Sequence, residues 1–407
     1  MSEAYIVATA RSPIGRARKG SLIDIRPDDL AAQMVAAALD QVPQLDPARI
    51  EDIMMGCGQP AGEQGMNIAR IVAVLLGLDS VPGTTVNRYC SSSLQTTRMA
   101  FHAIAAGEGD VFVSAGVESV THYAQGAADV MPGVKIENPV FDSAVERTAA
   151  RSQGGAALWR DPREDGFLPD PYIAMGQTAE NVAQVHGITR EAQDAFAARS
   201  QQRAEAAIAS GFWAREIAPV TLPDGSVVSS DDGPRPGVTT EALAGLDPVF
   251  RPDGTITAGN ACPLNDGAAA VVVVSERIVE ELSLSPLARI VSTGVSGLSP
   301  EIMGLGPVES SRRALERAGL SIDDIDLVEI NEAFAAQVLP SARALGVDED
   351  RLNVHGGAIA VGHPFGMTGA RITATLINGL TATGGRYGLE TMCVGGGQGM
   401  AMILERL

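Results

Sequence analysis

Aromatic side chains, cysteines and basic residues are all scarce in this sequence. Aromatics make up only 4% of its 407 residues, against 45% hydrophobic residues overall, so the core must be built mainly from Ala, Val, Leu and Ile. The four cysteines Cys57, Cys90, Cys262 and Cys393 contain no close pairing motif. They therefore give neither a disulfide framework nor a zinc signature, and no metal is expected.

The charge balance is acidic, with 30 Lys and Arg residues against 49 Asp and Glu residues and a formal net charge of −19. Nucleic acids and anionic membranes are bound by clustered cations that neutralise phosphates, so neither is expected as a partner. No apolar run reaches the ~18 residues that a membrane-spanning helix needs. The N-terminus lacks a secretory hydrophobic region, and the last three residues are not the peroxisomal tripeptide. The simplest prediction is a cytoplasmic enzyme.

The length and the hydrophobic pattern predict two similar α/β halves. A single core stops growing near ~250 to 300 residues, so this chain is too long for one. Three apolar runs read as buried strands: residues 111–115, 268–274 and 325–330. Three Ala-rich patterns read as helices: residues 28–39, 94–106 and 308–318. Such alternation is typical of parallel sheets covered by helices, and the similarity of residues 48–56 to residues 323–331 suggests that the unit is duplicated.

The composition changes between these halves, over roughly residues 120–264. This segment is charged and rich in Pro and Gly, as at residues 159–171 and 231–237. Its one strong helical pattern, residues 190–210, follows Thr189 as a plausible N-cap and stops at Gly211. The segment is therefore predicted to be an insertion that acts as a lid.

Two glycine-rich segments carry side chains suited to nucleophilic chemistry. Residues 353–371, NVHGGAIAVGHPFGMTGAR, place His363 among glycines, and a second cluster follows Cys393 in MCVGGGQG. Glycine is used where a ligand must approach the main chain. A thiol and an imidazole in such loops suggest a nucleophile and its base, although for His363 alone a structural turn residue is an equal alternative.

Cys90 lies where a short β-branched run ends and a helix of small residues begins, in TTVNRYCSSSLQ. The positive end of the helix dipole and the unpaired amides favour a thiolate, so the pKa of Cys90 is predicted to be lowered. Most free cysteines are inert, buried hydrophobic residues. That alternative holds for each of the four thiols taken alone.

Taken together, these motifs resemble the thiolase family, the CoA-dependent enzymes that cleave or form 3-ketoacyl-CoA thioesters. The chain also carries NEAFA at residues 331–335, GVES at residues 116–119 and TAGNACPLNDGAAA at residues 257–270, in the family's order from end to end. The resemblance implies a thiolase fold, with two duplicated βαβ-rich halves in a five-layered α/β/α/β/α arrangement and an inserted loop domain. It divides the chain into an N-terminal half (1–119 plus 265–286), an inserted lid domain (120–264) and a C-terminal half (287–407). It also implies a homodimer or homotetramer.

The resemblance assigns the catalytic roles. Cys90 is the expected nucleophile, His363 its base, and Cys393 the acid that protonates the acetyl-CoA enolate. By resemblance, His363 and Asn331 form the oxyanion hole for the enolate, with Asn331 acting through a water. The amides of Cys90 and Gly395 likewise form the hole for the tetrahedral intermediate. Taken without the other motifs, Asn331 would more simply be a helix cap.

The resemblance also indicates a channel for CoA, which is expected as a substrate and not as a tightly bound cofactor. Positions that resemble its lining are Met175, Arg235, Phe250, Ala258, Cys262, Met303 and Phe334. The acetoacetyl-specific biosynthetic thiolases that this segment resembles carry the motif YHMG where this chain reads YIAMG at residues 172–176. Ala174 therefore stands at the position of their histidine. This favours a degradative enzyme for longer acyl chains, as in β-oxidation of fatty acids, over the biosynthetic alternative.

Three other classes are less well supported. A ketoacyl synthase shares the fold but would use Cys with two histidines. A dinucleotide-binding dehydrogenase would need GxGxxG after the first strand, and a non-catalytic thiolase-like binding protein would be expected to have lost Cys90, His363 or Cys393. His355 stands where the family commonly has Asn, and it either tunes His363 or fills space.

Overall fold

A ten-stranded mixed sheet runs through both halves of the chain in the computed structural model, which describes residues 2–123 and 137–407. The strand order is β10-β11-β12-β9-β1-β8-β5-β3-β4, with β2 paired to β8 beside this path. The N-terminal strands are β1 (Ala4–Arg11), β2 (Gly15–Arg16), β3 (Asp52–Gly56), β4 (Gly83–Val86), β5 (Val111–Ser119) and β8 (Asn265–Ser275). The C-terminal strands are β9 (Ala288–Gly297), β10 (Leu327–Ile330), β11 (Tyr387–Val394) and β12 (Gln398–Arg406).

The two halves meet through a short antiparallel contact between β1 and β9, in which Tyr5 pairs with Arg289 and Ile6 with Ala288. On one side of this junction, β1 pairs with β8 and β8 with β5. On the other side, β9 pairs with β12 and β12 with β11. The backbone therefore links two half-sheets, each of which keeps its own hydrophobic core.

The three strands predicted from apolar runs are present, two of them longer and one shorter than predicted. Every residue of β5 and β8 is buried, because helices cover both faces of the sheet, and such strands read as continuous hydrophobic runs. Their polar ends were not part of the pattern, so the prediction missed residues 116–119 and 265–267. The third predicted strand corresponds to β10 and starts two residues later, at Leu327.

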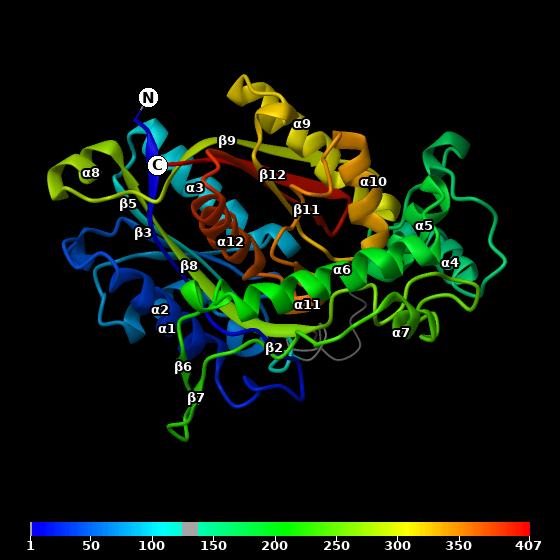
Figure 1. The fold of residues 1–407 in the computed structure, drawn as a ribbon, viewed down its shortest axis with the longest axis horizontal. Coiled ribbons are helices and arrows are strands. Elements are labelled where there is room, and N and C mark those ends of the chain that lie inside the picture. The colour runs from blue at the N-terminus through cyan, green and yellow to red at the C-terminus, as the bar shows by residue number, and fades with distance from the viewer. Residues whose placement is uncertain (1, 124–136) are drawn as a thin grey trace.

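Two helices, α3 (Ser92–Ala106) and α12 (Thr368–Thr383), lie between the half-sheets (Figure 1). They approach closely at Gly369, where an added Cβ would lie 2.2 Å from the Leu94 nitrogen. Ser93 Oγ accepts the backbone N–H of Ala370 at 2.9 Å, so the serine joins these helices. The predicted helices 94–106 and 28–39 are confirmed.

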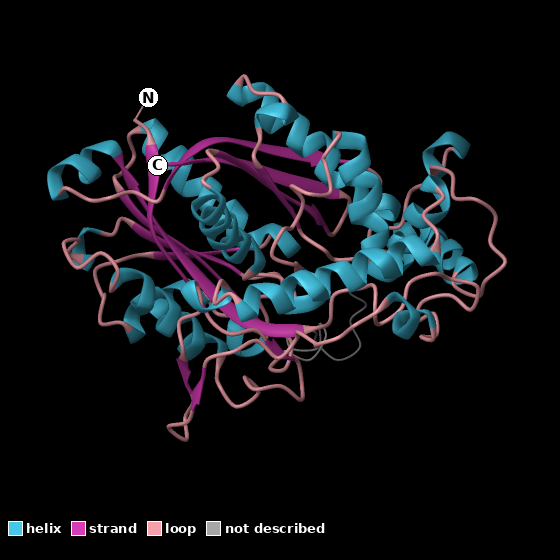
Figure 2. Ribbon diagram, in the orientation of Figure 1, coloured by secondary structure: helices cyan, strands magenta, loops and turns pink. Residues whose placement is uncertain are grey.

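Outer helices complete the five layers, and Figure 2 shows them on the far sides of the magenta strands. The N-terminal half carries α1 (Pro27–Leu39), α2 (Ile68–Leu75) and α8 (Glu276–Leu282). The C-terminal half carries α9 (Gly306–Ala318), α10 (Ala335–Leu345) and the short α11 (Ala358–Val361). Predicted helix 308–318 is α9, which begins two residues earlier because Pro307 suits a first helical turn.

The segment between the halves lies across one edge of the molecule. Its elements are α4 (Asp142–Arg151), α5 (Met175–His186), α6 (Arg190–Ala209), β6 (Val220–Thr221), β7 (Val227–Val228) and α7 (Thr240–Ala244). Thr189 caps α6 by accepting the N–H of Ala192, and Gly211 follows the helix at φ +72°, as predicted. Within the described ranges, the short strands β6 and β7 form a two-stranded sheet of their own. The predicted insertion also includes residues 124–136, which lie outside the described residues.

Across the described ranges, we find no helix with the length and apolarity needed to cross a membrane.

Candidate active site

Cys90 lies in a tight 3-10 turn, Tyr89–Ser91, between β4 and α3. Tyr89, directly before it, has the left-handed φ of +44°, a conformation that costs a bulky residue about 1 to 3 kcal/mol. Two hydrogen bonds hold this turn, from Tyr89 N–H to Asn87 Oδ1 at 2.8 Å and from Ser92 Oγ to the Tyr89 carbonyl at 2.7 Å. The strain turns Cys90 toward a cavity of about 490 Å³ whose wall it forms with Gly395 and Met175.

The predicted lowering of the Cys90 pKa is wrong for the unliganded protein. Burial raises the pKa of this thiol to about 11, although the N–H groups of Gly395 and of Cys90 itself favour the thiolate. The amides and the helix N-terminus are where the sequence places them, but desolvation of the charged form is the larger effect. The thiol is therefore protonated at neutral pH and needs a base.

His363 lies between α11 and α12, is buried, and has a defined tautomer. Thr368 Oγ1 donates its only proton to the Pro364 carbonyl at 2.7 Å, so it accepts from His363 Nδ1–H at 2.6 Å. Nε2 consequently carries the lone pair, and Asn331 Nδ2 donates to it at 3.3 Å. Asn331 is thus not a helix cap, because α10 starts after Phe334.

The charge state of His363 suits a base. Burial, and next the nearby Arg371 charge, lower the pKa of this imidazole to about 3. The ring is therefore neutral at rest, and an imidazolium forms only when a proton is transferred to it. The rings of His363 and Phe365 lie 5.2 Å apart in a T-shaped contact, and Phe365 lines the cavity at Cys90.

Replacing Thr368 by valine is expected to lower kcat/KM about 10- to 100-fold. The change leaves Nδ1–H without an acceptor, and an unsatisfied buried donor costs about 1 to 3 kcal/mol. The rates of the Val and Ser variants check this, since Thr368→Ser keeps the hydroxyl and should restore most of the activity. Equal losses in the two variants would mean that Thr368 acts only through packing.

Cys393 ends β11 beside a glycine hairpin, in which Gly396 and Gly397 have φ of +75° and +79°. The side chain is buried, and burial raises its pKa, with further increases from neighbouring Cys90 and Cys262. Cys262 in turn has its pKa raised by burial and then by Cys90. Three thiols from distant segments are therefore electrostatic neighbours, and all are protonated at rest.

Most of the residues predicted for the CoA channel meet beside these thiols. One hydrophobic cluster includes Met175, Phe250, Cys262, Met303, Phe334 and Cys393. The rings of Phe250 and Phe334 lie 6.3 Å apart in a T-shaped contact, and Cys262 N–H donates to the Ala333 carbonyl at 3.0 Å. Gly176 is required here, because an added Cβ would lie 2.3 Å from the Phe250 ring.

Arg235 and Ala258 lie apart from that cluster, in a second cavity that Arg16, Gln201 and Leu243 also line. This cavity has two arginines in its wall, Arg16 and Arg235. The predicted residues therefore form three groups: Cys90, Gly395 and Met175 in the first cavity, the Asn331–His363 pair, and the channel positions.

Sequence reasoning missed Glu118, although it quoted the GVES motif that contains it. The buried Glu118 carboxylate accepts from Gly58 N–H at 2.7 Å, Gln64 Nε2 at 2.6 Å and Gly366 N–H at 2.8 Å. It thereby joins the loop that lines the Cys90 cavity to the loop that carries His363. Burial raises the pKa of Glu118 to about 7. Asn265 was missed as well, and its Oδ1 accepts the His363 backbone N–H at 3.0 Å.

His355 fills space and does not tune His363. Its ring stacks on Phe212 with centroids 3.5 Å apart and planes 4° from parallel. Burial is the main cause that lowers its pKa to about 4, so it is neutral.

Cys90 lines one cavity, the neutral imidazole of His363 contacts Phe365 in the wall of that cavity, and the Cys393 thiol is a neighbour of Cys90. These groups define an acyl-transfer enzyme with a cysteine nucleophile. The family models for the thiolase N-terminal domain and the thiolase C-terminal domain match residues 4–277 and 284–406. The chain belongs to the thiolase family.

Named relatives cover the whole chain. A β-ketoadipyl-CoA thiolase of Pseudomonas aeruginosa is 44% identical, over 100% of this chain and 99% of its own. A 3-ketoacyl-CoA thiolase of Bacillus subtilis is 41% identical, over 100% of both. The crystal structure of human mitochondrial 3-ketoacyl-CoA thiolase superposes with a TM-score of 0.86 at 38% identity, over 100% of this chain and 99% of that one. The chain is therefore an acyltransferase of the thiolase type.

Proposed function

We propose that this protein is a degradative thiolase, which cleaves a 3-ketoacyl-CoA with CoA into acetyl-CoA and an acyl-CoA shortened by two carbons. The observation that carries the proposal is the Cys90 thiol in the cavity wall, with Cys393 as its neighbour and His363 against Phe365 of the same wall. Release of acetyl-CoA from 3-ketoacyl-CoA and CoA, measured by chromatography, tests it. An enzyme that releases none would overturn it.

In the first half-reaction, His363 Nε2 accepts the Cys90 proton while Sγ attacks the keto carbon. The bond between C2 and C3 then breaks, leaving an acyl-Cys90 thioester and the enolate of acetyl-CoA. Protonated Nε2 donates to the enolate oxygen, and Asn331 contributes through a water. The Asn331 Oδ1 atom supports that role, because it is buried and has no hydrogen-bond partner among the described residues.

Cys393 completes this half-reaction by donating its thiol proton to C2 of the enolate, which releases acetyl-CoA. CoA then attacks the acyl-Cys90 thioester, and the N–H groups of Cys90 and Gly395 hold the tetrahedral oxyanion. Collapse of the intermediate releases the shortened acyl-CoA. The proton that His363 took from Cys90 passes to the Cys393 thiolate, and the CoA thiol proton then reaches the Cys90 sulfur through His363, so both thiols are restored.

The acyl group is proposed to be longer than that of acetoacetyl-CoA. The cavity at Cys90 is larger than an acetyl group needs, and its described walls include Ile173, Met175 and Phe365. Ile173 and Met175 flank Ala174, which by resemblance stands where the biosynthetic enzymes have a histidine. The CoA itself is proposed to enter as a substrate through the channel that includes Phe250, Phe334 and Arg235.

Thiolysis is accordingly expected to become more efficient from acetoacetyl-CoA to a 3-ketoacyl-CoA of medium length. Each buried methylene contributes about 0.8 kcal/mol, so two would raise kcat/KM roughly tenfold. Ala174→His should reduce that preference, and Ala174→Ser serves as the small control. A profile that peaks at acetoacetyl-CoA and falls with each added carbon would restore the biosynthetic alternative.

A carboxylate-terminated acyl chain is the second candidate substrate. It is favoured by the names of the relatives, since those from Pseudomonas aeruginosa and Escherichia coli at 44% identity are described as β-ketoadipyl-CoA or 3-oxoadipyl-CoA thiolases. The described wall of the Cys90 cavity opposes it, because Glu137 is its one charged residue there. Comparing methyl-ended and carboxylate-ended chains of equal length distinguishes the two.

The protein is further proposed to work as a homodimer or homotetramer in the cytoplasm. Support for assembly comes from apolar side chains around the edge strand β4. Met66, Val74 and Leu75 are 89%, 50% and 50% exposed, and α2, which carries the latter two, packs beside β4. Light scattering of the purified protein measures the assembly.

A further inference from the structure

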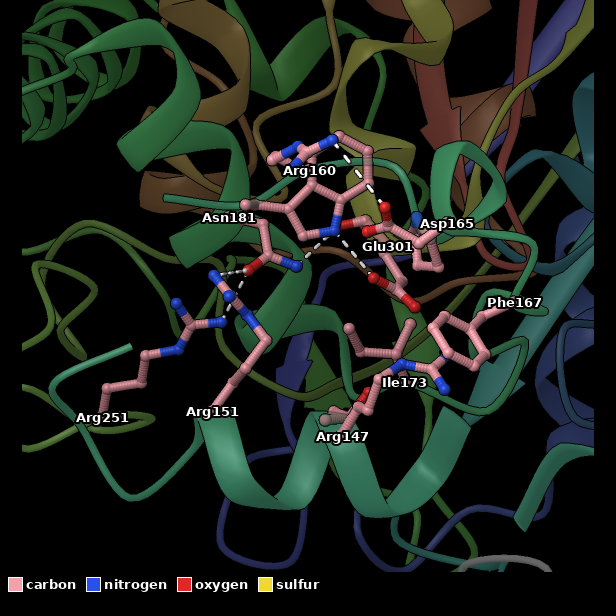
Figure 3. Close-up of a pocket in the computed structure, with 12 residues that line it drawn as sticks. Arg147, Arg151, Arg160, Asp165, Phe167, Ile173, Asn181, Arg251 and Glu301 are labelled. Carbon is pink, nitrogen blue, oxygen red and sulfur yellow. Dashed lines mark hydrogen bonds and ion pairs between the residues drawn. The ribbon is translucent and has the colours of Figure 1, made fainter. Parts of the chain in front are cut away.

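A third cavity, of about 180 Å³, lies in the segment between the two halves and is lined by four arginines: Arg147, Arg151, Arg160 and Arg251 (Figure 3). Trp159 and Phe167 form part of its wall. The residues come from α4, from residues 159–173, from α5, from the loop after Phe250 and, for Glu301, from the turn before α9. Such a concentration of positive charge is unusual in a chain whose net charge is −19.

Two of these arginines share one neutral acceptor. Arg251 Nη2 donates to Asn181 Oδ1 at 2.8 Å, and Arg151 Nη2 donates to the same oxygen at 3.3 Å (Figure 3). An amide oxygen cannot neutralise two guanidinium charges. Within the described parts of the chain, neither arginine forms an ion pair with a carboxylate.

Two buried donor atoms also have no partner. Arg251 is only 4% exposed, yet its Nη1 makes no hydrogen bond to any described residue, and neither does the buried Nε of Arg151. Leaving a buried charged donor unpaired is costly. A ligand that supplies oxygen acceptors would remove that cost.

The carboxylates nearby already have donors, and two of them, Asp165 and Glu301, line the cavity. Glu301 accepts from Trp159 Nε1 at 2.7 Å and from Asp170 N–H at 2.9 Å. Asp253 accepts from Gly155 N–H at 2.7 Å. Asp165 lies 3.9 Å from the exposed Arg160, which also pairs with Glu164 at 3.1 Å. The lining itself holds four arginines and two carboxylates, and Arg151 and Arg251 have no carboxylate as a hydrogen-bond partner among the described residues.

We propose that this arginine pocket binds a compact oxyanion, the carboxylate or phosphate group of a small molecule. Planar guanidinium groups present paired N–H donors that match two oxygens of such a group. The pocket is distinct from the cavity with Arg16 and Arg235, which is the proposed site of the CoA phosphates. No residue of that cavity lines the arginine pocket.

The oxyanion has two possible sources. Ile173 lines both the arginine pocket and the cavity at Cys90, so the far end of a carboxylate-terminated acyl chain is one source. A free anion is the other, and it would brace residues 159–173, of which residues 171–173 line the acyl cavity. The two sources predict different kinetics, although both require the same arginines.

Calorimetric titration of the CoA-free protein with inorganic phosphate, and separately with adipate, tests the site directly. Arg151→Gln is expected to weaken binding about tenfold or more, since a charged hydrogen-bonding group is lost. Arg163→Gln, an exposed arginine in the same segment, is the matched control and should leave the affinity unchanged. Arg235→Gln should also leave it unchanged, which separates this pocket from the CoA site.

Arg251→Gln provides a second test at the buried position, with circular dichroism to verify the fold. A wild-type protein that binds neither anion would overturn the proposal. So would unchanged affinity in the Arg151 variant.

A kinetic comparison separates the sources, and this arm alone rests on the proposed thiolase activity. If the acyl carboxylate is the ligand, Arg151→Gln should lower kcat/KM about tenfold for a carboxylate-ended 3-ketoacyl-CoA and not for its methyl-ended counterpart. If a free anion is the ligand, added phosphate should change kcat/KM by the same factor for both substrates. An inactive wild type would refute the proposed function, while the titration would still report on the pocket.

Discussion

Cys90→Ala is expected to abolish formation of the acyl-enzyme while CoA still binds. Only the attacking sulfur is removed, and loss of a catalytic nucleophile typically lowers kcat by about 10⁴-fold or more. The side chain is 8% exposed and alanine is smaller, so the fold should survive. Incubation with 3-ketoacyl-CoA followed by peptide mass spectrometry locates any acyl group, and calorimetry measures CoA binding.

The Cys393→Ser variant is the control for this experiment, since it keeps Cys90 and should still accept an acyl group from an acyl-CoA. An acyl group attached to Cys393 or Cys262 in the Cys90→Ala protein would show that the nucleophile is misassigned. Lost CoA binding together with an altered circular dichroism spectrum would instead indicate damage to the fold.

Cys393→Ser is expected to suppress deuterium exchange at the α-carbon of acetyl-CoA by about 10²- to 10⁴-fold, the range of general acid–base catalysis. A serine hydroxyl is a far weaker acid than a thiol and cannot exchange that proton. Acyl transfer from preformed acyl-Cys90 to CoA should remain comparatively intact, because no carbon is protonated in that step. Exchange is measured by NMR in D₂O, and transfer by rapid quench.

The two half-reactions distinguish the roles of the thiols. Equal loss of both in the Cys393→Ser protein would contradict the division between nucleophile and acid. Retained exchange would assign the α-proton to another group, and the neighbouring Cys262 would be the first to test.

Two opposing effects on the Cys90 pKa explain why the local sequence did not predict the protonation state of this thiol. The turn before α3 and the amide of Gly395 are both where motifs predicted them, and both favour the thiolate. Burial under the glycine hairpin and the surrounding loops opposes them and is larger. That burial depends on segments about 300 residues apart in the chain, so no local pattern contains it.

His363 illustrates the same limit in a different way. The glycine-rich motif identified the residue, but its function as a neutral base depends on the proton at Nδ1. Thr368 determines that position through its own hydrogen bond to the Pro364 carbonyl. Thr368 was within the quoted motif, and only the side-chain directions distinguish it from its neighbours.

The sequence by itself determined the elements whose signals are local. Continuous apolar runs predicted β5 and β8, because a strand buried on both faces has no polar side. Thr189 and Gly211 predicted the ends of α6, since capping and left-handed backbone are properties of single residues. Ordered motifs predicted the family and the nucleophile, base and acid as hypotheses about residues 90, 363 and 393.

Only the tertiary structure decided which distant groups share a space. It brought Asn331 to His363, Glu118 to both active-site loops, and Arg151 to Arg251 around a single amide oxygen. Desolvation, unpaired donors and mutual repulsion arise from such proximity, and they depend on distances that a linear pattern does not encode. The sequence therefore predicted the catalytic residues of the active site, whereas only the fold shows their protonation states and the arginine pocket.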